Sequence, residues 1–92
     1  MIEHVRWSRR ALDTISSLTS PRFSADETAE YRRRLLQTVE NKIMLLGASM
    51  PSRDEQYHGT YFVLVDRYKI YYKFSDDGKL AFVQTARHTH MQ

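Results

Sequence analysis

The chain has 92 residues, of which 41% are hydrophobic and 27% charged, and its formal net charge is +3. This length predicts a single domain over residues 1–92. Because the chain has no cysteine, disulfides, thiolate chemistry and cysteine-ligated zinc are excluded. The first residues have no secretory-type apolar segment, and no stretch approaches the roughly 18 apolar residues of a membrane span. We expect a cytoplasmic protein without a membrane partner, whose positive charge suits a polyanion or an acidic protein.

The N-terminal half predicts one strand and two helices. Residues 2–7 alternate imperfectly and favour a short strand. Ser8 can cap a helix whose apolar residues recur at helical spacing from 11 to 18, and Pro21 bounds it. Ser24 and Glu27 have the spacing of a capping box, which predicts a second helix of about 22 residues. Gly47 is a natural residue to follow its C-terminus.

The C-terminal half predicts a polar loop and three strands. Residues 50–59 are polar and form the loop. Residues 60–65 are almost continuously apolar, which is typical of a central strand covered on both faces. Residues 68–74 alternate as a strand, residues 76–78 form a hairpin turn, and residues 79–86 form the last strand before a tail at 87–92.

The order of these elements is β-α-α-β-β-β, which predicts an α+β fold. Two N-terminal helices should pack on one face of a mostly antiparallel four-stranded sheet. The last three strands are joined by short turns and should pair as a meander.

The first candidate site is a cationic and aromatic face on the strand at residues 68–74. Lys69, Tyr71 and Lys73 project to the same side, and Arg67 precedes them. Such a face offers charges to phosphates and a ring on which a base can stack. The alternative is an ordinary solvated sheet face that keeps its lysines for solubility.

The second candidate site is the C-terminal cluster of Arg87, His88 and His90. Two imidazoles and a guanidinium can serve phosphoryl transfer, the histidines by moving protons and the arginine by stabilising charge. The alternative is that these are exposed residues near a terminus. We expect no metal site, because the sequence shows no obvious third and fourth ligands. Arg53, in a loop with Asp54 and Glu55, could flank a groove or lie on a polar surface.

Together these features resemble the RelE/ParE toxin superfamily over nearly the whole chain. VRWSRRALDTI resembles the family's opening strand and helix start, and DETAEYRRRLLQTVENKIMLL resembles its long second helix. The stretch TYFVLVDRYKIYYKFSDDGKLAFVQTARHTHM resembles its strand-turn-strand region, in which residues 68–72 occupy the place of the family's "Y-R-[VLI]-x-Y" pattern.

The resemblance implies the toxin of a type II toxin–antitoxin pair with no cofactor. RelE-like toxins cleave mRNA in the ribosomal A site by attack of a ribose 2′-hydroxyl on the adjacent phosphate. On this reading Lys69 and Arg87 stabilise the phosphate, His88 or His90 moves protons, and Tyr68 or Tyr71 holds a base. The substrate would also be contacted by Arg53, Arg67 and Lys73. Lysine at position 69 stands where those enzymes usually have arginine, so it lacks the bidentate fork.

The ParE-like branch is the alternative. Those toxins inhibit DNA gyrase without catalysis, and His88-Thr89-His90-Met91 resembles their "His-x-Arg-Met" ending. An inert homologue is a third reading. Either toxin reading implies a cognate antitoxin, which we expect to wrap the domain with a helix and to cover the basic sheet face with acidic, partly disordered segments.

Overall fold

The observed elements follow the predicted order. The computed structural model describes residues 2–17 and 24–89, so the predicted positions Leu18, Pro21 and His90 lie outside it. The elements are, in order, β1 (His4–Trp7), α1 (Arg9–Ser16), α2 (Ala25–Leu46), a short 3-10 turn (Glu55–Tyr57), β2 (Tyr61–Val65), β3 (Tyr68–Phe74) and β4 (Leu80–His88). Within these residues, no helix is both long and apolar enough to cross a membrane.

Both helices begin at the predicted caps. The Ser8 hydroxyl accepts a hydrogen bond from the Ala11 amide at 3.0 Å and donates one to the Gln84 carbonyl at 2.6 Å, so the cap of α1 is also tied to β4. Ser24 and Glu27 form the full capping box of α2. The helix α2 has the 22 residues expected and ends at Gly47, whose φ of 52° favours glycine.

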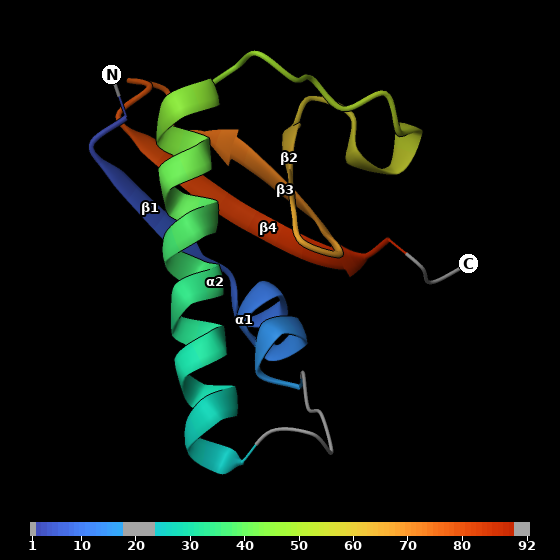
Figure 1. The fold of residues 1–92 in the computed structure, drawn as a ribbon. Coiled ribbons are helices and arrows are strands. Elements are labelled where there is room, and N and C mark those ends of the chain that lie inside the picture. Colours follow the sequence, from blue (N-terminus) through green and yellow to red (C-terminus); the bar gives the residue numbers. More distant parts are fainter. Residues whose placement is uncertain (1, 18–23, 90–92) are drawn as a thin grey trace.

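The four strands form one sheet in the order β1-β4-β3-β2. The predicted meander is confirmed, because β2 pairs with β3 and β3 with β4, both antiparallel. β1 pairs in parallel with β4. Figure 1 shows α1 and α2 on the same side of this sheet. The opposite face, which the helices leave uncovered, is called the outer face below.

The expectation that residues 60–65 form a central strand is wrong, because β2 lies at an edge of the sheet. Only its alternate residues Val63 and Val65 enter the core under the helices. Leu64, on the other side, is 46% exposed. Phe62 lies beneath the loop that precedes β2 and lines a cavity there. The long apolar run therefore reflects helices on one face and a loop over part of the other.

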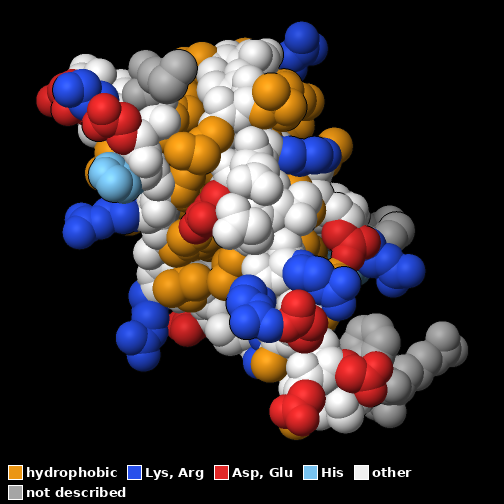
Figure 2. Space-filling model, turned by 60° about the vertical axis from the view of Figure 1, so that its left-hand side comes forward, with side chains coloured by type: hydrophobic (Ala, Val, Ile, Leu, Met, Phe, Trp, Pro, Cys, Tyr) orange, Lys and Arg blue, Asp and Glu red, His pale blue; other side chains and the backbone are white. Residues whose placement is uncertain are grey.

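The core lies between the two helices and the inner face of the sheet. Its fully buried members from the helices are Ala11, Ile15, Val39 and Ile43, and from the sheet Val63, Ile70, Tyr72, Ala81 and Val83. Val5 and Trp7 of β1 pack against its margin. Figure 2, which looks onto the side that β1 forms, shows apolar side chains interspersed with both basic and acidic side chains.

A bulge in β4 sets which residues reach the outer face. Tyr71 lies opposite Thr85 but Tyr72 lies opposite Val83, so Gln84 is the extra residue. Beyond it, Ala86 faces the core and Arg87 faces outward. β4 also runs two residues further than predicted, because Tyr68 and Lys69 continue to pair with it. Arg87 and His88 therefore end a strand instead of starting a tail.

Candidate functional site

Lys69 and Arg87 form a cross-strand pair on the outer face. They are direct neighbours in the β3–β4 register, a position that brings Cβ atoms to roughly 5 Å. Like charges in this position destabilise a sheet. In the described part of the chain, neither has an ion-pair partner. Two adjacent cations without a carboxylate partner are therefore a candidate site for an anion.

The loop before β2 is attached to the outer face beside this pair. The Tyr71 hydroxyl donates to Asp54 Oδ2 at 2.7 Å, and the Tyr57 ring stacks on the Tyr71 ring with centroids 4.1 Å apart. Lys69 Nζ lies 4.4 Å from the centroid of Phe62 and 5.2 Å from that of Tyr71, within the range of cation–π attraction. These contacts hold the loop and the ammonium group in a fixed arrangement.

A cavity of about 470 Å³ opens where the loop meets the sheet. It is lined by residues 49–51 together with Arg53, Asp54, Phe62 and Lys69. The site thus combines two cations and one carboxylate around an aromatic wall. Such a set can bind a phosphate through its cations and accept a proton at the carboxylate.

Burial, and next the hydrogen bond to Asp54, raise the pKa of Tyr71 to about 12, and the nearby Arg87 partly opposes this rise. Tyr71 therefore keeps its proton at neutral pH and acts as a hydrogen-bond donor to Asp54.

Several of the predicted site residues come together. Lys69, Arg87 and Arg53 lie around the cavity or beside it. Lys73 is the next residue of β3 after Tyr71 that points to the same face, and it pairs with Phe82. Arg67 is exposed in the turn between β2 and β3, where its carbonyl accepts the Thr89 amide at 2.7 Å.

Tyr68 and Tyr71 are both buried, which argues against the stacking role predicted for them. Tyr68 belongs to the core under the helices and is 5% exposed. Tyr71 is on the expected face, but the loop covers it and leaves it 1% exposed. Tyr57 already occupies a face of its ring. Neither ring is free to receive a base.

His88 points to the side opposite Arg87, as alternation along an extended segment predicts. It pairs with Tyr68, and the two rings meet edge to face with centroids 5.4 Å apart. Because neighbours in a strand point to opposite faces, His88 lies on the helix side while Arg87 lies outside. His88 therefore cannot assist chemistry at Arg87, and the second histidine of the prediction, His90, lies outside the described residues.

Sequence reasoning named the loop of Asp54 and Tyr57 as one that could flank a groove, but it gave neither residue a role, and it missed Phe62 as the wall. A tyrosine within an otherwise polar loop is a usable signal for Tyr57. Phe62 could have been found by reading residues 60–65 as an alternating strand. Nothing in the sequence distinguishes Asp54 from Glu55.

No protein-family model and no curated protein matches the chain. Solved structures do match. A chain of the toxin–antitoxin complex RelBE2 from Mycobacterium tuberculosis has a TM-score of 0.68 at 14% identity, with 96% of this chain and 99% of that chain covered. The isolated E. coli RelE toxin gives 0.55 at 14%, covering 98% and 87%. A RelE mutant bound to a RelB antitoxin peptide gives 0.50 at 16%, covering 94% and 82%.

At these identities the likeness shows the fold. The chain has the α+β fold of the RelE toxins, as the sequence resemblance implied. The two helices on one face of a four-stranded mixed sheet are shared over nearly its full length.

Proposed function

We propose that this protein is the toxin of a type II toxin–antitoxin pair and acts in the cytoplasm as a ribosome-dependent mRNA endoribonuclease. The RelE-like fold supports the toxin assignment. One observation carries the nuclease assignment, namely that Lys69 and Arg87 are opposed on an open sheet face beside a cavity. A fold that only had to bury its core would gain stability by separating these charges.

In the proposed reaction the scissile phosphate lies against Lys69 and Arg87. The ribose 2′-oxygen attacks phosphorus while the bond to the 5′-oxygen of the next nucleotide breaks. The products are a 2′,3′-cyclic phosphate and a 5′-hydroxyl end, whose departing oxygen takes its proton from water. The two cations bind the non-bridging oxygens most strongly when charge accumulates there in the transition state, and Arg53 contributes from the loop.

The proton from the 2′-hydroxyl needs an acceptor, and Asp54 is the carboxylate that lines the cavity with Lys69. Tyr71 donates to its Oδ2, which fixes the carboxylate and leaves Oδ1 available to a substrate. We assign the general-base role to Asp54, in place of the histidines.

The proposed partner is a cognate antitoxin. Two of the similar structures contain a toxin with its antitoxin or an antitoxin peptide. An acidic segment laid over the outer face would neutralise Lys69 and Arg87 and close the cavity, and its folding on binding would also stabilise this small domain.

The test is growth arrest on induced expression of R87A and K69A. We expect both variants to lose arrest and A-site mRNA cleavage by at least about a hundredfold, the usual effect of removing one group that stabilises transition-state charge. R9Q is the matched control, because Arg9 is a highly exposed helix residue paired only with Asp13 at 3.6 Å. Circular dichroism checks folding.

Arrest and cleavage that persist in R87A would refute the nuclease assignment. If R87A still arrests growth, translation continues and purified gyrase loses supercoiling activity in its presence, the protein is a gyrase inhibitor. Expression of the wild type without growth arrest would contradict the toxin assignment itself.

A further inference from the structure

The outer face carries a second row of cationic and aromatic residues. The Tyr71–Thr85 pair separates this row from the Lys69–Arg87 pair. We propose that Arg6, Phe82 and Lys73 form a subsite for single-stranded RNA that holds nucleotides flanking the scissile phosphate. This inference rests on the proposed function. It adds that the protein contacts a longer stretch of RNA than the two nucleotides at the scissile phosphate.

The strand register places the three residues in one line across the sheet. Arg6 of β1 is the neighbour of Phe82 of β4, and Phe82 is the neighbour of Lys73 of β3. With strands spaced about 4.8 Å apart, the two cations stand roughly 10 Å from one another with the ring between them. The parallel pairing of β1 with β4 is what brings Arg6 into this row.

All three side chains lie on the outer face. On β1, Val5 and Trp7 pack against the core, so Arg6 between them points outward. On β4, Ala81 and Val83 are core residues and flank Phe82. On β3, Tyr72 and Phe74 lie against the core and flank Lys73. Phe82 is partly exposed, and Arg6 and Lys73 are exposed.

The cations of this row are available to a ligand. Among the described residues, no carboxylate forms an ion pair with Arg6 or Lys73. The acidic residues at this end of the sheet belong to an adjoining cavity of about 840 Å³ that Arg6 also lines. There Asp77 accepts from the Ser75 hydroxyl at 2.6 Å and the Lys79 amide at 3.0 Å.

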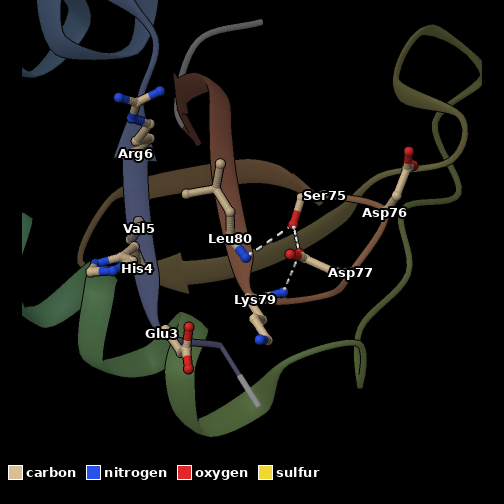
Figure 3. A pocket seen from close by; sticks show the side chains of 9 residues that line it. All are labelled: Glu3, His4, Val5, Arg6, Ser75, Asp76, Asp77, Lys79 and Leu80. Carbon is tan, nitrogen blue, oxygen red and sulfur yellow. Dashed lines mark hydrogen bonds between the residues drawn. The ribbon is translucent and has the colours of Figure 1, made fainter.

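Figure 3 shows the residues that line the cavity at this acidic end of the sheet. Glu3 and Lys79 lie at one end of the cavity and Arg6 at the other, with Leu80 between β1 and the turn. A polyanion would be repelled by Glu3 and the turn at residues 75–77. It would therefore run from Arg6 and Lys73 toward Lys69 and Arg87.

The spacing between the two rows fits a nucleic acid better than a single small anion. Lys69 and Lys73 are four residues apart on one face of β3, or about 13 Å. That distance exceeds the separation of adjacent phosphates, so one strand of RNA can reach both rows. An aromatic ring between cations is how proteins without base-specific contacts bind single strands, by stacking a base while charges track the backbone.

The test measures binding of a labelled single-stranded RNA of about eight nucleotides at several salt concentrations. For R6Q/K73Q we expect the slope of log K against log salt to be less steep by about 1.4, because each lost phosphate contact on a single strand removes about 0.7. F82L should bind roughly tenfold more weakly, and F82Y, which keeps the ring, should restore binding. R9Q/R10Q removes the same charge from exposed positions of α1 and should leave the slope unchanged.

A slope for R6Q/K73Q equal to that of R9Q/R10Q, or a wild-type chain that binds no RNA, would overturn the inference. If K69Q/R87Q alone changes the slope, the subsite is absent but the proposed function stands. If these variants weaken binding of a polyglutamate peptide more than binding of RNA, the ligand is an acidic protein and the inference is wrong. Thermal melting of each variant excludes unfolding as the cause.

Discussion

At the scale of single residues, the site depends on how one carboxylate is held. Asp54 lies in a loop whose backbone could take many positions, but the Tyr71 hydroxyl fixes Oδ2 at 2.7 Å. Because the pKa of Tyr71 is raised to about 12 by burial and by this hydrogen bond, the tyrosine stays a donor over the physiological pH range. Asp54 is therefore the hydrogen-bond acceptor of the pair.

We predict that D54N loses RNA cleavage while it keeps its fold. The amide oxygen can still accept the Tyr71 hydrogen bond, but the side chain is no longer a base, and general-base loss typically costs about a hundredfold or more in rate. The measurement is the rate at which each purified variant cleaves mRNA bound to purified ribosomes.

E55Q is the matched control. Glu55 is the next residue and is exposed, it does not line the cavity, and the Tyr71 hydrogen bond goes to Asp54. An E55Q variant as inactive as D54N would show that the charge of the loop matters and that Asp54 is not the base.

At the scale of elements, the bulge at Gln84 and the β3–β4 register decide which side chains meet. A one-residue change of register moves every later side chain of a strand to the other face. With the bulge, Arg87 meets Lys69 on the outer face and His88 meets Tyr68 on the helix side. The sheet thus places two cations together at the cost of some stability.

We predict that R87Q raises the free energy of unfolding by a few tenths of a kcal/mol, because it removes the repulsion between like charges on neighbouring strands. The increase should shrink as salt rises, since salt screens exposed charges. Urea unfolding at low and high salt measures both effects. A destabilised R87Q would show that Arg87 supports the fold and would remove the main argument for an anion site.

How much of the fold could be predicted also depends on the element. The helices were predicted well because their signals are local: the caps at Ser8 and Ser24 and the turn glycine at Gly47 act within a few residues. β2 was misplaced because its position at the edge depends on which strands pair, which is not encoded within residues 60–65 themselves. The parallel β1–β4 pair joins residues about 76 positions apart, as in the Ser8–Gln84 contact.

The candidate site was predicted in part for the same reason. Alternation along β3 correctly put Lys69, Tyr71 and Lys73 on one face. It could not say that residues 54–57 would fold back and cover Tyr71. Nor could it show that a bulge in β4 would turn His88 to the helix side, because a bulge without glycine leaves no clear pattern in the local sequence.

At the scale of the whole molecule, tyrosine hydroxyls connect the layers. Tyr31 of α2 donates to Asp66 in the β2–β3 turn, Tyr71 joins the sheet to the loop, and Tyr72 of the sheet donates to the Gly47 carbonyl at the end of α2. In each case burial is the largest cause that raises the pKa, to about 12 for Tyr31, Tyr71 and Tyr72.

We predict that the protein loses stability between pH 10 and about pH 12. The folded-state pKa of each tyrosine lies above the ordinary value of 10, so its contribution is fully present below pH 10 and is lost as pH rises through the folded value. Urea unfolding at pH 9 and pH 11 measures the loss. Y71F, which cannot ionise, should lose less than the wild type over this range, and an equal loss would contradict the role given to Tyr71.

The parallel pairing of β1 with β4 has a consequence for biosynthesis. Among the described residues, β1 joins the rest of the sheet only through β4, which is synthesised after the other three strands. Until β4 emerges, the cap of α1 lacks its Gln84 acceptor and Lys69 lacks its neighbour Arg87. A nascent chain therefore cannot bring Lys69 and Arg87 together until β4 has been synthesised.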